Sequence, residues 1–346
     1  MGIFPVWVRV PPRAQIPSLK VVFYFYFDII PKRDCTLKKL DIERFEVTLA
    51  GIKLAHPLMN AAGTCKLLEE VKELVPANTS AIIVGSITQE EREIKAGNRF
   101  WAGDLFSINC MELPNPGASY YQKHLPEMAK IAHKLNKPLF VSVFGFTPKE
   151  YTLLTEIAFG GGADLVELNL GCSNFLKDGK RMRPPCFSPY LINKILKCVQ
   201  EKVGKEAKVA VKLAPFTDSS ALQKAARIIT QWRVVKAVTT TNTLPGVPVY
   251  DEEGKPLIDS EDGLAALGGP MLKPLALGNV KQLRRILPKH IDVIGCGGIT
   301  FGKDIKHYLQ TGAAAVQIAT ALLKFGPRVF DRLLIEFFES IKNSPI

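Results

Sequence analysis

The sequence predicts an α/β fold of the (β/α)8 TIM barrel type, with an N-terminal β-hairpin and a short N-terminal extension. Eight apolar, β-rich runs follow one another from Phe45 onward, and amphipathic helix-like stretches lie between most of them. Parallel strands need crossover connections, usually helices, so this alternation favours a parallel barrel. The length of 346 residues also fits, because barrels often run roughly 200 to 400 residues as one domain. A doubly wound parallel sheet is the competing topology.

The predicted elements begin with the hairpin, in the segment FEVTLAGIKLAHP, which turns at Ala50-Gly51. Helices are expected between the strands, for example in the stretch that follows Ser188 and in the one that closes on Gly312. The eight strand-like runs are, in order, LMNAAG (58–63), AIIVGSI (81–87), PLFVSVFG (138–145), LVELNLGC (165–172), VAVKLAP (209–215), AVTTTNT (237–243), DVIGCGG (292–298) and AVQIATAL (315–322).

The composition is that of a chain with a sizeable core. Hydrophobic residues make up 47% and charged residues 23%, which excludes disorder. The formal charge of +12 suggests anionic ligands, but much of it is lysine on expected helix faces, where solvated surface is the default interpretation. Seven cysteines without a CxxC pair argue against a disulfide framework or a zinc site. We therefore expect no metal, and a reducing, cytoplasmic location.

The first forty residues differ from the rest. They hold a Pro-rich start and the aromatic run LKVVFYFYFDII (19–30), which is shorter than the ~18 residues of a membrane span. The run lacks a basic region before it and a small-residue cleavage site, so a signal peptide is not indicated. We predict a poorly ordered extension at 1–40 and a catalytic barrel at 41–346. A surface- or membrane-contacting segment is the alternative for 1–40.

Polar residues gather at the predicted C-terminal strand ends, the face where barrel enzymes place their sites. Buried polar side chains are costly unless paired, so a shared ligand is an economical explanation for the whole group. Emergence into solvent could explain any single member. The group is Asn60, Ser86, Asn169, Cys172, Lys212, Asn242 and Thr243.

Two further signals concern anions. Gly297-Gly298 after the seventh run and Ala319-Thr320 at the eighth fall where barrels recurrently bind phosphate. Lys212 stands inside an apolar strand and needs an anionic or polar partner, either an ion pair within the fold or a ligand. If the ligand is the partner, replacing Lys212 should impair chemistry rather than stability.

With these features together, the sequence resembles the dihydroorotate dehydrogenase family, from about Asp41 to the C-terminus. Cysteine serves as the base in the soluble class 1 members of this family, and Cys172 holds that position; the hairpin also suits class 1. The motifs that carry the resemblance are MNAAG, NCMELPNPG, NLGCSN, VKLAP, TNT, KPLALGNV, IGCGGITFGKDIKHYLQTGAAAVQIATAL and FGPRVFDRLLIE.

The resemblance implies an FMN enzyme of pyrimidine biosynthesis that oxidises dihydroorotate to orotate. Cys172 would take a proton from C5 while C6 delivers a hydride to the flavin. The residue types suit this chemistry, because a proton next to a carbonyl needs a positioned base. Carboxamides also match the alternating N–H and C=O edge of a pyrimidine.

Carried over residue by residue, the resemblance implies two overlapping sets. The cofactor set is Ala61, Ala62, Gly63, Ser86, Asn169, Lys212, Thr243, Gly268, Gly269, Gly297, Gly298, Ala319 and Thr320. The substrate set is Lys66, Asn109, Met111, Leu113, Asn169, Asn174, Asn242 and Thr243.

The chain departs from the family pattern at four places. Gly85 stands where class 1 enzymes usually carry a substrate-contacting lysine, and Lys66 stands where class 2 enzymes keep the equivalent lysine. Glu112 replaces a usual glycine, and we expect its carboxylate either to repel the substrate carboxylate or to point to solvent. Gly171 and Ser173 replace the usual serine and proline beside the base.

Three other functions stay open. A dihydropyrimidine dehydrogenase-like barrel would reduce uracil and needs no carboxylate pocket. A dihydrouridine synthase-like enzyme would bind tRNA, but would be expected to add a helical RNA-binding domain, so we expect no nucleic-acid partner. A non-enzymatic scaffold would purify colourless. For the favoured reading we expect a homodimer. The electron acceptor is open between fumarate, a quinone, and NAD through an iron–sulfur partner subunit, because this chain has no cysteine cluster for such a centre.

Overall fold

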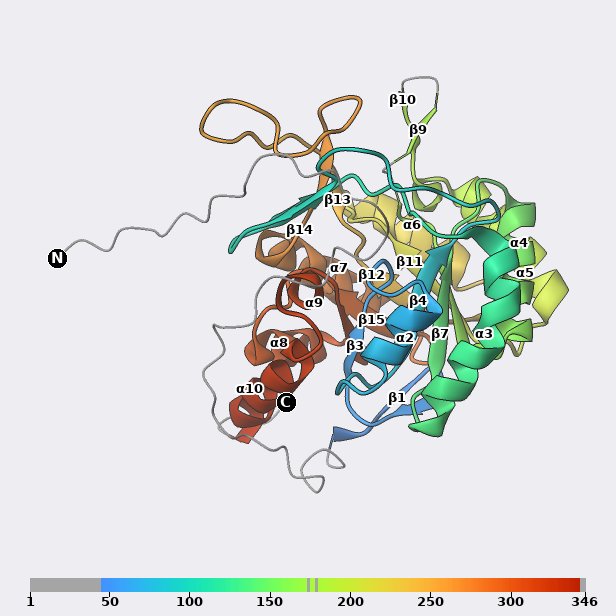
Figure 1. The fold of residues 1–346 in the computed structure, drawn as a ribbon. Coiled ribbons are helices and arrows are strands. Elements are labelled where there is room, and N and C mark those ends of the chain that lie inside the picture. Colours follow the sequence, from blue (N-terminus) through green and yellow to red (C-terminus); the bar gives the residue numbers. More distant parts are fainter. Residues whose placement is uncertain (1–44, 173–174, 178–179, 343–346) are drawn as a thin grey trace. The chain divides into compact units, whose positions relative to one another are not determined.

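The predicted barrel is confirmed in a computed structural model of the chain, which describes residues 45–172, 175–177 and 180–342. Eight strands form one sheet in which every neighbouring pair is parallel. Seven of the eight predicted runs contain one of them, and the run 237–243 overlaps β12, which begins two residues earlier (Figure 1). Around the sheet the strands are β3 (Leu58–Asn60), β16 (Ala315–Ile318), β15 (Asp292–Cys296), β12 (Val235–Thr240), β11 (Val209–Leu213), β8 (Leu165–Asn169), β7 (Leu139–Val143) and β4 (Ile82–Ile87).

A helix follows every barrel strand, and several helices begin at residues that cap them. The Thr147 and Ser188 side chains accept hydrogen bonds from the first turns of their helices, and both helices have proline next. The Asp218 carboxylate caps a third helix. The helices are α2 (Leu68–Leu74), α3 (Gly117–Lys134), α4 (Pro148–Gly160), α5 (Pro189–Val203), α6 (Ser219–Ile229), α7 (Lys273–Ile286), α8 (Gly302–Thr311), α9 (Thr320–Phe325) and α10 (Val329–Lys342).

The N-terminal end of the barrel is filled by apolar side chains and covered by the predicted hairpin. Strands β1 (Val47–Leu49) and β2 (Ile52–Leu54) pair antiparallel around Ala50, whose N–H donates to Asp292 Oδ2 at 2.7 Å. The hairpin therefore closes this end and adds to its apolar cluster. That cluster consists of Leu49, Ala50, Leu54, Met59, Ala81, Ile83, Phe140, Leu165, Ala210, Ala237, Ile294 and Ala315.

A side chain joins the two ends of the strand ladder. In the described ranges β3 and β4 are its terminal strands, and Asn60 bridges them. Its Nδ2 donates to the Ile83 carbonyl at 2.8 Å, and the Ile83 N–H donates to its Oδ1 at 2.9 Å. Nδ2 also lies 3.1 Å from Thr64 Oγ1. The expectation that Asn60 shares a ligand is therefore wrong, because its carboxamide is used in barrel closure.

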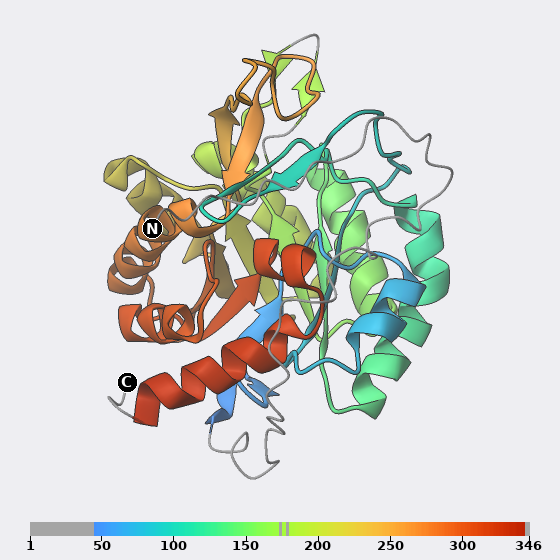
Figure 2. The ribbon, with the colours of Figure 1, turned by 60° about the vertical axis from the view of Figure 1, so that its left-hand side comes forward.

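A four-stranded antiparallel sheet, which the sequence did not predict, is built from two insertions between strand and helix. One insertion follows β4 and the other follows β12, and the order of the sheet is β13-β14-β6-β5. It lies at the end of the barrel opposite the β1–β2 hairpin (Figures 1 and 2). The strands are β5 (Phe100–Ala102), β6 (Ser107–Asn109), β13 (Leu244–Val247) and β14 (Ala265–Gly268).

The remaining elements are short. Strands β9 (Leu176–Lys177) and β10 (Lys180–Arg181) form a hairpin after β8, and 3-10 turns span Pro185–Phe187 and Pro270–Leu272. The predicted extension at 1–40 lies outside the described residues, so its order and its boundary stay predictions. Where the chain is described, no helix combines the length and the apolar character that crossing a lipid bilayer requires.

Candidate active site

A chain of hydrogen bonds links polar side chains across the C-terminal ends of four strands. Ser142 and Ser86 share a hydrogen bond of 2.8 Å between their hydroxyls, and Asn169 Nδ2 donates to Ser86 Oγ at 2.9 Å. Asn242 Nδ2 then donates to Asn169 Oδ1 at 3.0 Å, and the Thr243 N–H donates to Asn242 Oδ1 at 2.8 Å. The structure therefore brings together four residues that the sequence predicted, and adds Ser142.

Lys212 has a partner within the fold, which is the first of the two alternatives expected for it. Its Nζ lies 3.1 Å from Gln317 Oε1 and 3.6 Å from Glu167 Oε1. Glu167 Oε2 accepts hydrogen bonds from Thr239 and Gln317. Burial alone would lower the pKa of Lys212, but attraction to Glu167 and to neighbouring thiols outweighs it, and the pKa lies above its ordinary value. Replacing Lys212 would therefore also destabilise the fold.

Glu167 is a member of the buried polar network that the sequence analysis missed. It is 1% exposed, and its Oε1 accepts no hydrogen bond from the described residues. An acidic residue inside the apolar run LVELN was a readable signal, because a buried carboxylate needs a partner and Lys212 carries the opposite charge.

Cys172 lies directly after the end of β8, in an apolar surrounding. It is 8% exposed and packs in a small cluster with Phe144 and Phe175, whose rings stack with their centroids 4.7 Å apart. Leu113, a predicted substrate residue, packs against the same cluster. The predicted base and one wall of the predicted substrate pocket therefore meet, while Asn174 lies outside the described residues.

The glycines predicted to hold a phosphate lie together in a tight corner. A Cβ placed on Gly298 would come within 2.9 Å of the Gly269 carbonyl, and one on Gly268 within 2.9 Å of Ser107 Oγ. The Ser107 hydroxyl hydrogen-bonds the hydroxyl of Thr320, the first residue of α9, at 2.8 Å. Such a cradle of backbone and hydroxyl groups suits an anion, because glycines carry no side chain of their own between a ligand and their N–H groups.

Gly297 and Ala319 complete the corner, and two unpaired hydroxyls lie at the end of β12, where the Thr241 N–H donates to the carbonyl of Cys296, the residue before Gly297. Gly297 has a φ of 127°, which favours glycine, and Ala319 immediately precedes α9. Thr240 and Thr241 are buried, and their hydroxyls have no hydrogen-bond partner in the described part of the chain. Buried unpaired hydroxyls are uncommon. Thr241 follows β12 at the barrel mouth, where a polar ligand would satisfy its hydroxyl, whereas Thr240 faces the opposite side of β12 from the inward Thr239.

Lys66 lies on the loop after β3 that also carries Ala61, Ala62 and Gly63. Burial lowers the pKa of Lys66 to about 8, although Glu70 opposes this shift. No hydrogen bond or ion pair reaches its Nζ from the residues that the structure describes, although the Lys66 N–H donates to Glu70. An ammonium that makes no close ion pair within the fold can bind an anion.

Two departures from the family pattern have a packing reason. A Cβ on Gly85 would lie 2.3 Å from the Ser142 carbonyl oxygen, and one on Gly171 would lie 2.4 Å from the Ala214 nitrogen. Either side chain would force the backbone to shift. Because position 85 cannot carry a lysine side chain without such a shift, Lys66 is the candidate for the substrate-binding cation. It follows Cys65, which forms a β-bridge with Gly85.

Glu112 neither points to solvent nor stands free to repel a substrate, so both expectations for it are wrong. It is 7% exposed, and its carboxylate lies 2.7 Å from Arg99 Nη2, 3.0 Å from Lys95 Nζ and 3.7 Å from Arg92 Nη2. Its φ of 56° is left-handed, which costs a residue with a Cβ about 1–2 kcal/mol. The three cations neutralise the carboxylate and hold it in place.

The other predicted residues of this insertion flank Glu112. Asn109 ends β6, and its Nδ2 lies 3.3 Å from the Ala266 carbonyl of β14. Met111 is partly buried, and Leu113 has the same left-handed φ of 56° as Glu112. The insertion sheet therefore carries the predicted wall of the substrate pocket.

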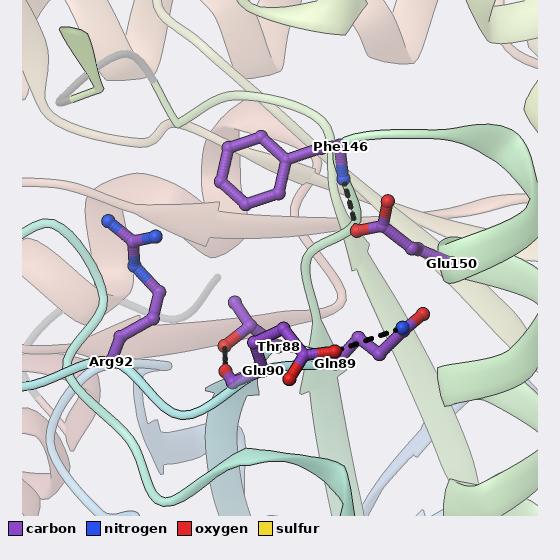
Figure 3. A pocket seen from close by; sticks show the side chains of 6 residues that line it. All are labelled: Thr88, Gln89, Glu90, Arg92, Phe146 and Glu150. Carbon is purple, nitrogen blue, oxygen red and sulfur yellow. Dashed lines mark hydrogen bonds between the residues drawn. The ribbon is translucent and has the colours of Figure 1, made fainter. Parts of the chain in front are cut away.

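A small pocket of about 150 Å³ opens beside this wall, after β4 and β7. Figure 3 shows the Arg92 guanidinium and the Phe146 ring on one side of it, with Glu150 and the segment 88–90 around the rest. The guanidinium lies 5.7 Å from the Phe146 ring centroid. The sequence did not predict this pocket.

Comparison with known proteins gives a consistent result. The family model described as dihydroorotate dehydrogenase matches residues 44–341. The chain is 34% identical over 298 residues to dihydroorotate dehydrogenase A (fumarate) of Lactococcus lactis subsp. cremoris, covering 86% of this chain and 93% of the relative. It is 33% identical over 291 residues to dihydroorotate dehydrogenase (fumarate) of Trypanosoma cruzi, covering 82% and 89% of the two chains.

Proposed function

The chain belongs to the dihydroorotate dehydrogenase family, and we propose that it oxidises dihydroorotate to orotate in pyrimidine biosynthesis. This makes it an oxidoreductase that acts on a CH–CH bond. The observation that carries the proposal is the hydrogen-bonded chain of Ser86, Asn169, Asn242 and Thr243 at the barrel mouth. It presents two carboxamides, which match a pyrimidine edge: Asn169 at the end of β8, the strand that leads directly to Cys172, and Asn242 after β12.

The family implies a flavin cofactor, and we propose that it is FMN. FMN held in this site would supply the hydride acceptor that the oxidation of dihydroorotate at C6 requires. The corner formed by Gly268, Gly269, Gly297, Gly298 and Thr320 supports a single phosphate group as the anchor. We further assign Ala61, Ala62, Gly63, Ser86, Lys212 and Ala319 to the walls of the flavin site.

We assign the proton transfer to Cys172, which takes the proton from C5 of the substrate. The loss of this proton and of the C6 hydride leaves the double bond of orotate. The apolar side chains of Phe144, Phe175 and Leu113 around Cys172 keep water away from the transfer. Lys66 supplies a positive charge that the fold does not neutralise, which suits the carboxylate of dihydroorotate.

We propose fumarate as the electron acceptor, because the names of both relatives include it. Fumarate is a small dicarboxylate, so it shares the anionic character of the substrate. The homodimer, the alternative iron–sulfur partner and the cytoplasmic location stay predictions from the sequence.

Rapid mixing of the FMN-loaded protein with dihydroorotate under anaerobic conditions tests the proposal. We expect the flavin absorbance to bleach with dihydroorotate and to return on addition of fumarate. Bleaching by dihydrouracil but not by dihydroorotate would instead support a dihydropyrimidine dehydrogenase-like reaction, which the comparisons do not favour. A protein that stays colourless after incubation with FMN would overturn both.

A further inference from the structure

We propose that Glu112 is a positioning residue for Cys172, acting through the side chains that wall the thiol. The inference rests on the proposed function, in which Cys172 is the base. Glu112 touches neither the thiol nor the predicted phosphate corner among the contacts described above. It reaches the surroundings of Cys172 by two routes, one through the backbone and one through a guanidinium.

The backbone route runs through Leu113. Glu112 and Leu113 are consecutive left-handed residues, and Leu113 packs against the Cys172 cluster. Arg92 holds the backbone of this segment, since its Nε donates to the Glu112 carbonyl at 2.8 Å. Its backbone also exchanges two hydrogen bonds with Asn115, at 2.8 and 2.9 Å. The place of the Leu113 side chain is therefore set by contacts that converge on Glu112 and Arg92.

The guanidinium route runs through Phe175. The Arg92 guanidinium, drawn toward the Glu112 carboxylate, lies 4.8 Å from the Phe175 ring centroid. Phe175 stacks on Phe144, and both pack against Cys172. A cation over an aromatic face is attracted to the ring, so it helps to hold the ring in place. Glu112 thus orients Arg92, and Arg92 holds Phe175, one of the side chains that pack around the Cys172 thiol.

The other two cations anchor Glu112 to the second insertion. Arg99 is 7% exposed and also donates to the Asp259 carbonyl, and its Nε donates to the Cys110 carbonyl at 3.0 Å. Lys95 pairs with Glu261 at 2.8 Å as well as with Glu112. The Glu112 carboxylate therefore helps to connect the two insertions at the barrel mouth, because Arg99 and Lys95 each contact both it and the second insertion. Without it, a buried guanidinium loses its only close ion pair in the described ranges, which is costly.

The side chain of Glu112 is not needed for its own backbone conformation. Glycine adopts a φ of 56° more readily than glutamate does. The contribution of Glu112 therefore comes from its charged contacts, and these can be removed while the backbone is kept. This allows a test that separates positioning from simple loss of fold.

The test uses Glu112→Gln, which keeps the shape without the charge, and Glu112→Gly, which relieves the backbone. Glu206→Gln is the matched control, because Glu206 also pairs with two cations, Arg233 and Lys236, but on the surface. Two quantities are measured on the FMN-loaded protein. One is the flavin reduction rate at saturating dihydroorotate, and the other is the rate at which iodoacetamide alkylates Cys172, read by peptide mass spectrometry.

We expect both Glu112 variants to reduce flavin on the order of 10-fold more slowly at saturation, since a misplacement of about 1 Å can cost ~10²-fold and a smaller shift of Cys172 is expected here. Cys172 should be alkylated faster than in the wild type, because its wall is loosened. The control should match the wild type in both measurements. Should Glu112→Gln fail to fold, Arg92→Leu carries the same two expectations.

Wild-type rates of both flavin reduction and alkylation in the folded variants would overturn the proposal, whatever their melting temperatures. A variant that only raises the KM for dihydroorotate, with wild-type alkylation, would equally overturn it and leave Glu112 a structural residue. If wild-type protein is not bleached by dihydroorotate, the proposed function fails instead. The alkylation rates still decide whether Glu112 sets the surroundings of Cys172.

Discussion

The two halves of the barrel interior are built from the same strands but differ in character. On β8 the inward side chains pass from Leu165 in the apolar cluster to Glu167 and then to Asn169. On β7 they pass from Phe140 to Ser142, because every second residue faces the same side of a strand. The same step occurs on three further strands, from Ala210 to Lys212, from Ala237 to Thr239 and from Ala315 to Gln317.

The comparison shows how one set of strands serves stability at one end and chemistry at the other. In the apolar half a lost methylene group costs only its packing and transfer free energy. In the polar half each side chain satisfies another, so the loss of one leaves a buried group without its partner. The loss of unfolding free energy on substitution should therefore depend on which half the residue lies in. In the polar half it should also depend on whether the hydrogen-bond or ion-pair partner of that residue is replaced at the same time.

The largest effect is expected beyond the polar half, at Cys172. Cys172→Ala should keep the fold and FMN but slow flavin reduction at saturating dihydroorotate by about 10²–10⁴-fold, the usual contribution of a positioned base. Cys172→Ser should retain a little activity that rises with pH. Saturation separates this from weakened binding. If Cys172→Ala is reduced at the wild-type rate, the assignment of the base is wrong.

The next effect is on stability and concerns Lys212. Lys212→Met should lower the free energy of unfolding by about 3–5 kcal/mol, because it leaves Glu167 buried without its cation. Urea denaturation measures this. The double variant Lys212→Met/Glu167→Gln should recover much of the loss, since no charge then lacks a partner. Equal loss in the single and double variants would mean that the pair contributes by packing alone.

A smaller effect is expected from the pH dependence of Lys66. With its pKa lowered to about 8, the ammonium is charged below that pH and neutral above it. Titration calorimetry should therefore show orotate affinity falling severalfold as pH rises past about 8, and Lys66→Met should lose this dependence. Without ligand the sign reverses for stability: the unfolded chain binds the extra proton between pH 8 and 10.5, so stability rises with pH across that window.

The smallest effect is expected in the apolar half. Ile294→Val should destabilise the protein by about 1 kcal/mol, because one buried methylene group is lost. Flavin reduction at saturating substrate should match the wild type. A change in that rate larger than the change in unfolding free energy would show that the two halves are not separable.

The barrel could be predicted from the sequence because its signals are local. Each of the eight strands is a short apolar run, and the hairpin turn at Ala50-Gly51 is visible in a dozen residues. The insertion sheet could not be predicted in this way. Its strands are three or four residues long, and β6 pairs with β14, which lies far along the chain.

The sequence predicted which residues gather at the site better than it predicted what each of them does there. Ser86, Asn169, Asn242 and Thr243 come together as expected, because strand ends of a barrel share one face. The roles of Asn60 and Glu112 were misread, since each depends on a partner that neighbouring sequence does not reveal. The sequence can place a polar residue at a strand end, but it does not reveal which group that residue contacts.

The bridge made by Asn60 has a consequence for how the barrel tolerates genetic change. Along a strand ladder almost any residue can be exchanged, because the backbone supplies its own donor and acceptor. At the junction of β3 and β4 the donor and the acceptor that meet the Ile83 backbone belong to a single carboxamide. Even aspartate, one nucleotide from asparagine in the code, offers no donor in its charged form. The codon for Asn60 should therefore tolerate fewer changes than those of its neighbours on β3, even though Ser80 also joins the two strands by donating to the Leu58 carbonyl.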